Sequence, residues 1–292
     1  MKNLKSLIIL TSIVFGLVSC NNGDDVPNNN KEEINKRIVL EAIKKVFDGQ
    51  NLTLVNKYYA NGYIQHNPTI ADGKAGLVAT LQNFINNGIS IERDLSRVVA
   101  QGDRVFIHSR VKFIQNEAII NAVIIGDIFR IENEKIKEHW DVIQQEPNPS
   151  VSAANGNTMI DGAGNPDYNI SETDLNRNIN TASSIMNKVL GDGQLNLVPT
   201  LFQEPYIQHN PNIPNGTDAL VNFLTNNGPL NLETKQIIAE GDLVVTFNHI
   251  MSFNNANIDM FRLNEEGKAN EHWDIIQSIP SEDDFAHDNG FF

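Results

Sequence analysis

Apolar residues recur at helical spacing in the first half of residues 32–146 and form strand-like stretches in the second half. Residues 32–47 place Ile34, Ile38 and Val46 on one face, which predicts an amphipathic helix. Asn133-Glu134 separates the last two apolar stretches and predicts a tight hairpin turn. The same patterns predict helices at residues 52–59 and 74–86, and strands at residues 94–100, 104–114, 117–131 and 135–145.

The same series of elements occurs twice, because four short segments recur later in the chain. Residues 63–68 (YIQHNP) return as 206–211, and residues 138–144 (EHWDVIQ) return as 271–277 with one Val/Ile change. Gly102-Asp103 and the segment 127–130 also have counterparts, at 241–242 and 259–262. A repeat of this length indicates a duplicated domain rather than a solenoid.

The domain organisation follows from these repeats and from the composition between them. Three helices followed by an antiparallel meander indicate an α+β fold, which we expect as two tandem cone-shaped barrels, each of three helices wrapped by a curved antiparallel sheet. The predicted segments are a signal peptide (1–19), a flexible tether (20–31), domain 1 (32–146), a linker rich in Pro, Gly, Asn and Ser (147–172), domain 2 (173–279) and a tail (280–292).

The N-terminal segment is typical of an exported lipoprotein. Lys2 and Lys5 precede an apolar run, residues 7–18, that is too short to span a bilayer. It ends in Leu-Val-Ser-Cys, which resembles a lipobox with Cys20 as the lipidated residue. We expect a chain exported and lipid-anchored to the bacterial membrane, at the outer membrane or cell surface. The alternative is an ordinary signal peptide with a chance cysteine, but Cys20 is the sole cysteine of the chain.

The charge and the cysteine content exclude several functions. A net charge of −14 argues against nucleic-acid binding and against electrostatic adhesion to anionic lipid, so membrane contact is expected through the anchor alone. One cysteine leaves no disulfide and no cysteine metal cluster. No pair of histidines has helical ligand spacing, and we therefore predict no metal site.

The element order and the repeated motifs resemble the SnoaL-like group of the nuclear transport factor two-like superfamily. The resemblance covers residues 33–145 and 174–278 and is carried by Tyr-Ile-Gln-His-Asn-Pro, Gly-Asp, Asp-Ile-Phe-Arg and Glu-His-Trp-Asp-Val-Ile-Gln. Members of this group are polyketide cyclases and predicted aldol-condensation enzymes. The resemblance implies a cavity lined by the segment after the second helix and by alternating strand positions. It also implies that the two domains pair through their sheets as an intramolecular pseudo-dimer.

Strand alternation combined with the resemblance places two carboxylates and two imidazoles in each cavity. Such groups, desolvated and paired, suit proton transfer beside a carbonyl without any cofactor. The expected catalytic residues are His66, Asp127, His139 and Asp141 in domain 1, and His209, Asp259, His272 and Asp274 in domain 2. The expected pocket residues are Tyr63, His108, Arg110 and Phe129, and then Tyr206, Phe247, His249 and Phe261.

Two functions stay open at this point. The first is an enzyme that performs aldol cyclisation, isomerisation or dehydration on a small carbonyl compound. The second is a non-catalytic lipoprotein that binds a small apolar ligand or a partner protein. Each polar residue also has a structural interpretation, such as Asp127 as a buried hydrogen-bond acceptor. The copies differ where Phe247 replaces His108 and His249 replaces Arg110, so two open cavities would differ in polarity.

Overall fold

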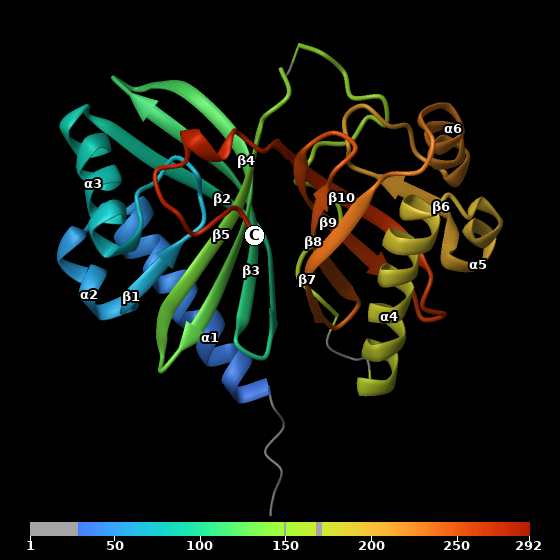
Figure 1. The fold of residues 1–292 in the computed structure, drawn as a ribbon, viewed down its shortest axis with the longest axis horizontal. Coiled ribbons are helices and arrows are strands. Elements are labelled where there is room, and N and C mark those ends of the chain that lie inside the picture. The colour runs from blue at the N-terminus through green and yellow to red at the C-terminus, as the bar shows by residue number, and fades with distance from the viewer. Residues whose placement is uncertain (1–28, 149, 168–170) are drawn as a thin grey trace, which may run out of the picture.

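The chain folds into two similar units, each with helices on one face of a five-stranded sheet (Figure 1). The computed structural model describes residues 29–148, 150–167 and 171–292. The predicted signal peptide, the lipidation at Cys20 and most of the tether lie outside these ranges and stay predictions. Within the described ranges, no helix is long and apolar enough to cross a membrane.

The first unit has the predicted order of helices and strands, with one added strand. Its helix α1 runs on into a π-helical segment, and a 3-10 turn precedes α2. The elements are α1 (Asn29–Ala42), the π-helical segment (Ile43–Asp48), the 3-10 turn (Leu52–Leu54), α2 (Val55–Tyr58), β1 (Tyr59–Gln65), α3 (Gly73–Asn86), β2 (Ile89–Gln101), β3 (Arg104–Gln115), β4 (Ala118–Glu132) and β5 (Lys135–Gln145).

The second unit repeats this order element by element, including the π-helical segment. A short 3-10 turn, Glu282–Asp284, follows its last strand. The elements are α4 (Glu172–Ser184), a π-helical segment (Ile185–Gly191), a 3-10 turn (Leu195–Leu197), α5 (Val198–Leu201), β6 (Phe202–Gln208), α6 (Thr217–Asn227), β7 (Leu232–Glu240), β8 (Leu243–Ile250), β9 (Asn255–Leu263) and β10 (Ala269–Ser278).

The sheets are open rather than closed. Their strand orders are β1-β5-β4-β3-β2 and β6-β10-β9-β8-β7, so β1 and β2 lie at opposite edges and do not pair. The prediction of an α+β fold in two tandem domains is confirmed, and each predicted cone-shaped barrel is an open five-stranded sheet rather than a closed one. All neighbours pair antiparallel except the first strand of each sheet: β1 runs parallel to β5, and β6 runs parallel to β10. Asn133 and Glu134 form the predicted hairpin turn, with φ of 51° and 57°.

Both faces of the central strands are apolar because one face packs against the helices and the other against the second unit's sheet. In β4, Phe129 and Ile131 pack against α1 and α3 in the core of the first unit. Ile124 and Ile128 point the other way, into a second core shared with Ile258 and Ile275 of the second unit. The continuous apolar pattern of β4 therefore reflects burial on both sides.

The outer faces of the two sheets contact each other across an approximate two-fold axis. The Ile143 amide donates to Gln277 Oε1 at 2.6 Å, and the equivalent Ile276 amide donates to Gln144 Oε1 at 2.7 Å. One of the differences between the two units lies at the point where equivalent positions meet. Gly126 of β4 faces Ile258, its own counterpart in β9, and a Cβ on Gly126 would lie 2.7 Å from Ile258 Cδ1.

Candidate active site

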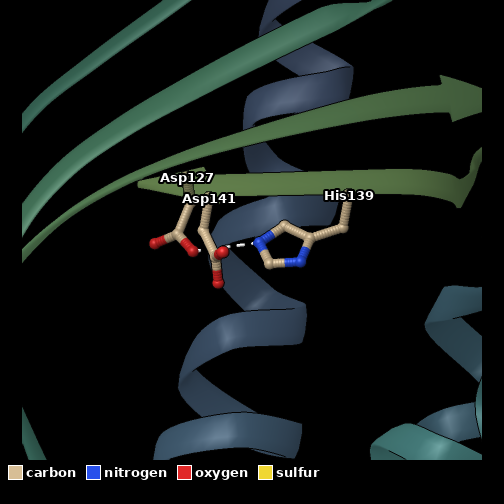
Figure 2. Close-up of side chains that lie close together, drawn as sticks. All are labelled: Asp127, His139 and Asp141. Atoms are coloured by element: carbon tan, nitrogen blue, oxygen red, sulfur yellow. Dashed lines mark hydrogen bonds and ion pairs between the residues drawn. The ribbon is translucent and has the colours of Figure 1, made fainter. Parts of the chain in front are cut away.

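Asp127, His139 and Asp141 lie together on the inner face of the first sheet, and we call these three residues the inner cluster. Asp127 of β4 is paired in register with Asp141 of β5, and His139 precedes Asp141 by two residues on the same face. His139 Nε2 lies 3.0 Å from Asp127 Oδ1 (Figure 2). The three side chains are almost fully buried, at 6% to 8% exposure, so their charges depend on one another.

Asp141 has a neutral hydrogen-bond donor as its partner. The Asn67 Nδ2 amide donates to both carboxylate oxygens of Asp141, at 2.9 and 2.8 Å. Burial raises the pKa of Asp141, the charge of Asp127 adds to this, and His139 and Asn67 oppose it. A carboxylate with a raised pKa is a stronger base once it is ionised.

His139 is held from both sides in a protonated form. Its Nδ1–H donates to Gln65 Oε1 at 3.0 Å, and its Nε2 faces the Asp127 carboxylate. Burial acts against the charged ring, but the hydrogen bond to Asp127 and the charge of Asp141 raise the pKa of His139. The ring also stacks on Phe129, with centroids 4.6 Å apart. The imidazolium is therefore a fixed positive charge beside Asp141.

Asp127 has a second cation, Arg93, which the sequence pattern did not single out. Arg93 Nη1 donates to Asp127 Oδ2 at 3.2 Å and to Ser109 Oγ at 2.6 Å. Its Nε donates to Asp48 Oδ1 at 3.2 Å. The strand predicted from residue 94 onward in fact begins at Ile89, so Arg93 is a strand residue on the inner face. Counting alternate residues from Asp127 through the pairing of β3 would have placed Arg93 on the same face of the sheet.

These polar groups form one end of a cavity of about 340 Å³. Burial raises the pKa of Tyr63 well above its usual value, so its phenol stays protonated at the cavity wall. Tyr63 Oη accepts from Gln65 Nε2 at 3.1 Å, which leaves its O–H free to point into the cavity among the described residues. The apolar lining residues are Ile43, Phe47, Ile70, Leu77, Phe84, Phe113, Ile125, Phe129 and Ile143.

The same three side chains are close enough to hold a cation. Their ligand atoms lie within 4.8 Å of one another, and the second unit has an equivalent trio. In the first unit, however, Arg93 and Asn67 already occupy carboxylate oxygens that a cation would need. The donor set of the first unit fits proton transfer better than metal binding.

Three of the expected site residues of the first unit lie outside the cavity. Tyr63 and Phe129 line the cavity as expected. His66 does not: its ring stacks on Trp140 at 4.8 Å, and its Nε2 donates to Glu138 Oε1 on the outer face of β5. His108 and Arg110 also point outward, because their register partners in β4 alternate with Asp127. The placement of these three residues in the cavity is therefore wrong.

The outward residues of the first unit have structural partners instead. His108 Nδ1 bonds Arg97 Nη1 at 3.0 Å between the two sheets, and burial lowers the pKa of His108 well below its usual value. Arg110 Nη2 donates to Glu146 Oε2 at 2.8 Å. The error has one cause: neighbouring residues in a strand face opposite sides, and His108 is one residue away from the inward Ile107.

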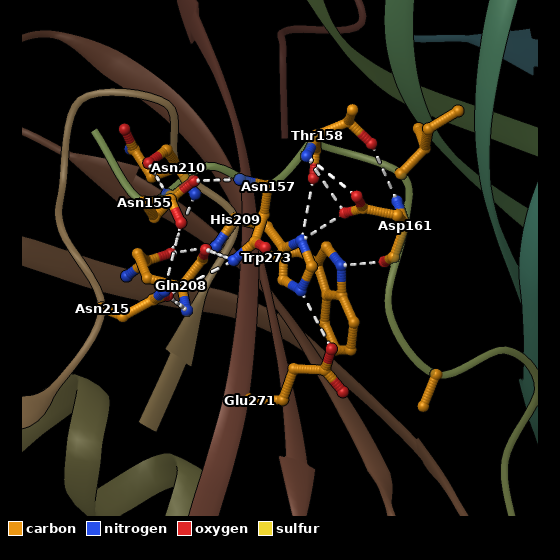
Figure 3. Close-up of polar contacts among 12 residues, drawn as sticks. Asn155, Asn157, Thr158, Asp161, Gln208, His209, Asn210, Asn215, Glu271 and Trp273 are labelled. Atoms are coloured by element: carbon orange, nitrogen blue, oxygen red, sulfur yellow. Dashed lines mark hydrogen bonds and ion pairs between the residues drawn. The ribbon is translucent and has the colours of Figure 1, made fainter. Parts of the chain in front are cut away.

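The second unit repeats both the agreement and the errors. Asp259, His272 and Asp274 form the inner cluster, with Tyr206 and Phe261 in the core beside it. His209 stacks on Trp273 at 4.7 Å and bonds Glu271, outside that cluster (Figure 3). Phe247 belongs to the core between the sheets, and His249 packs on Phe292. The expected cavity positions of His209, Phe247 and His249 are wrong for the same reason of parity.

The comparison with protein families decides the identity of the first unit. Residues 37–147 match the family described as SnoaL-like polyketide cyclase. The first unit is a SnoaL-like domain. The match begins in α1 and ends just after β5, so it contains every residue of the inner cluster and the whole cavity. A comparison with curated proteins found no match.

Several solved structures are similar to single units of the chain. TsrD from Streptomyces laurentii is 17% identical with a TM-score of 0.32, over 41% of this chain and 92% of that one. An LEH-like epoxide hydrolase from M. tuberculosis is 15% identical with a TM-score of 0.35, over 39% and 85%. IdmH from Streptomyces antibioticus is 14% identical with a TM-score of 0.33, over 38% and 91%.

The second unit differs from the SnoaL-like domain in the charge around its cluster. Leu232 stands where the SnoaL-like domain has Arg93, and Gly191 stands where it has Asp48. Asn248 Nδ2 donates to Asp259 Oδ2 at 2.9 Å and replaces the arginine with a neutral group. Burial, together with the charge of Asp259, raises the pKa of Asp274 to about 6. The Arg93–Asp48 ion pair of the SnoaL-like domain therefore has neither of its two residues in the second unit.

Proposed function

We propose that the SnoaL-like domain catalyses a cofactor-independent acid/base reaction on a small carbonyl compound, of the aldol-cyclisation, isomerisation or dehydration type. The observation that carries this proposal is Asp141, a buried carboxylate held by a neutral amide beside an imidazolium, at the wall of a cavity of about 340 Å³. The family match of residues 37–147 supports cyclase-type chemistry. Export and anchoring through Cys20 belong to the same proposal and rest on the sequence.

The apolar end of the cavity selects the substrate. Its lining of phenylalanine, leucine and isoleucine side chains favours a planar or alicyclic compound whose carbonyl reaches the polar end. Asp141 then removes a proton from the carbon beside the carbonyl, and the electron pair moves onto the carbonyl oxygen. The Tyr63 O–H and the charge of His139 stabilise the resulting enolate.

The second half of the reaction returns the proton. In an aldol cyclisation, the enolate carbon attacks a second carbonyl of the same molecule and forms a carbon–carbon bond. The new alkoxide takes the proton that Asp141 holds, which restores the carboxylate. In an isomerisation, the same proton returns to a different carbon. No oxidant, reductant or further reactant enters either balance.

The first prediction concerns Asp141→Asn, which keeps the shape and removes the base. We expect proton exchange at the carbon beside the carbonyl to fall about 100-fold or more, because general-base catalysis is typically worth that much. The measurement is deuterium incorporation from D2O into a panel of aryl methyl ketones and 1,3-diketones, followed by NMR. Stability should change little, since Asn67 and the new amide can still hydrogen-bond.

The control and the opposing outcome use the same two measurements. Asp218→Asn changes an exposed carboxylate of α6 and should leave both exchange and stability unchanged. If Asp141 is purely structural, Asp141→Asn should lower the free energy of unfolding by about 1–3 kcal/mol and leave exchange as it was. If the cavity only binds a ligand, wild type should bind the probes without accelerating exchange above the rate in water. Either result contradicts the proposal.

A further inference from the structure

The segment after the second sheet returns to the first unit and covers the loop that follows β1. We call residues 285–292 the C-terminal arm, and residues 65–72 the first loop. Figure 1 shows this arm lying against the first unit. The bonds are Ala286 N to Pro68 O (2.8 Å), His287 Nε2 to Asn67 O (2.9 Å), Asn289 Nδ2 to Gln65 O (3.0 Å) and to Asp72 Oδ1 (2.7 Å), and His66 Nδ1 to Gly290 O (3.0 Å).

The linker makes the same set of bonds to the second unit. We call residues 153–160 the linker arm, and residues 208–215 the second loop; Figure 3 shows them together. The bonds are Ala154 N to Pro211 O (2.8 Å), Asn155 Nδ2 to Asn210 O (2.6 Å), Asn157 Nδ2 to Gln208 O (2.9 Å) and to Asn215 Oδ1 (3.3 Å), and His209 Nδ1 to Thr158 O (2.8 Å).

The two arms are therefore a further part of the repeat, exchanged between the units. Ala154 and Asn157 of the linker arm match Ala286 and Asn289 of the C-terminal arm in both spacing and partner. Met159 and Phe291, which follow at the same spacing, are both buried in the core between the sheets. Each unit is thus covered by the segment that leaves the other unit's sheet.

The first loop carries the hydrogen-bond donor on which the site depends. Asn67 uses its side-chain amide on Asp141, its Oδ1 on Thr69, and its backbone N–H on Gln65 Oε1. Its carbonyl oxygen accepts from the Ile70 N–H at 3.1 Å within the loop and from His287 Nε2 of the arm at 2.9 Å. Gln65, whose side chain holds His139, has its own carbonyl oxygen bonded by Asn289.

His66 and His209, at equivalent positions of the two loops, connect each arm to the sheet rather than to the cavity. His66 bonds Gly290 O with Nδ1 and Glu138 Oε1 with Nε2, and both of these oxygens only accept hydrogen bonds. Although burial acts the other way, the bonds to His66 and Arg130 lower the pKa of Glu138, which stays charged. His66 therefore bridges the arm to β5, one strand position away from His139.

We propose that His287 and Asn289 are positioning residues of the first unit's site, and that Asn155 and Asn157 are their counterparts in the second. The arm fixes the backbone of the loop from outside, and this fixes Asn67 on Asp141 inside. The C-terminal arm, which follows the second sheet, completes the first unit's site. The linker arm, which follows the first sheet, completes the second unit's site. This inference concerns the same site as the proposed function, and it extends that proposal to residues far away in sequence.

The test compares Asn289→Ala with the matched variant Asn157→Ala in the full chain. Each substitution removes two hydrogen bonds from one loop. We expect Asn289→Ala to speed amide hydrogen exchange in residues 65–72 about tenfold or more, with residues 208–215 unchanged. Asn157→Ala should give the reverse pattern. Equal loosening of both loops, or of neither, would overturn the proposal.

A second measurement separates positioning from simple loop stability. Carboxyl-carbon NMR across a pH titration should show a further rise in the pKa of Asp141 in Asn289→Ala, because the donor Asn67 is displaced. The pKa of Asp141 should stay at its wild-type value in Asn157→Ala. An unchanged pKa in both variants contradicts the proposal even if the loop loosens. If the pKa of Asp141 rises in Asn289→Ala but the wild-type protein does not accelerate ketone proton exchange, the positioning role is supported and only the proposed function is contradicted.

Discussion

The buried carboxylates differ in how their charge is balanced, and Asp274 shows the consequence most clearly. Burial raises its pKa from 3.8 to about 6, and its Oδ1 has no hydrogen-bond partner in the described structure. The folded protein therefore binds a proton at Asp274 more tightly than the unfolded chain does. The stability that this proton provides is present below about pH 4 and is lost as the pH rises through about 6.

We therefore predict that Asp274→Asn gains stability relative to wild type as the pH rises. Asparagine cannot ionise, so only wild type has the penalty at neutral pH. Between pH 4 and pH 7.5 the difference in unfolding free energy should shift by on the order of 3 kcal/mol in favour of the variant. Urea unfolding at several pH values measures it. Asp218→Asn serves as the control, and a pH-independent difference for Asp274→Asn would contradict the assignment.

The residues of the inner cluster could be predicted from strand alternation combined with the family resemblance, whereas the roles of Asn67 and Gln65 could not. Asp127, His139 and Asp141 lie at even spacing on paired strands, so parity brought them together. His108 was misplaced because parity must be carried through the register of two strands, and a one-residue error reverses the side. Asn67 and Gln65 act through a loop whose shape depends on contacts with residues near 289, which no local pattern reveals.

At the scale of elements, helix α3 shows how closely the loop and the helices pack. Gly76 lies inside α3 so near the first loop that a Cβ would fall 1.7 Å from Ala71 O. Alanine favours a helix by about 1 kcal/mol over glycine, so propensity alone predicts a stabilising change. The steric overlap involves backbone rather than a flexible side chain, and it outweighs that gain.

We accordingly predict that Gly76→Ala lowers the free energy of unfolding by about 1–3 kcal/mol, as overpacking of a well-packed site does. The matched position in α6 is Ala219, where Ala219→Gly should cost only the propensity of about 1 kcal/mol. Thermal and urea unfolding of both variants provides the comparison. Stabilisation by Gly76→Ala would show that the loop is free to move away from α3.

The helices and the four antiparallel strands of each unit follow from periodicity, but β1 does not. Its sequence, Tyr-Ala-Asn-Gly-Tyr-Ile-Gln, has no regular alternation and contains Gly62 at φ 68°. The strand exists because β5 offers it an edge, and the register between them shifts at a bulge. Pairing that depends on a distant strand is a tertiary effect, so local sequence did not reveal it.

At the scale of the whole molecule, the contact between the sheets depends on the pairing of unlike residues. Valine in place of Gly126 would suit a strand by propensity, by at most about 1 kcal/mol. It would also collide with Ile258, Ile275 and Phe106, which all lie within 3.1 Å of the added Cβ. We predict that Gly126→Val lowers the unfolding free energy by about 1–3 kcal/mol or more.

A double-mutant cycle identifies the cause. Ile258→Ala alone should cost about 2–5 kcal/mol by leaving a cavity in the core between the sheets. Combined with Gly126→Val, it should cost less than the sum of the two single changes, because the valine fills the vacated space. Strict additivity, measured by urea unfolding, would mean that the two residues do not meet as described.

Gly126 and Ile258 also have a consequence for the history of the gene. They descend from one ancestral position that meets its own copy at the axis, so two identical copies would place either two glycines or two isoleucines there. The first pairing leaves a hole and the second a collision. Once the copies had diverged at this point, each half required the other rather than a second copy of itself. Recombination that made the halves identical again would be selected against, and so would the deletion of either half.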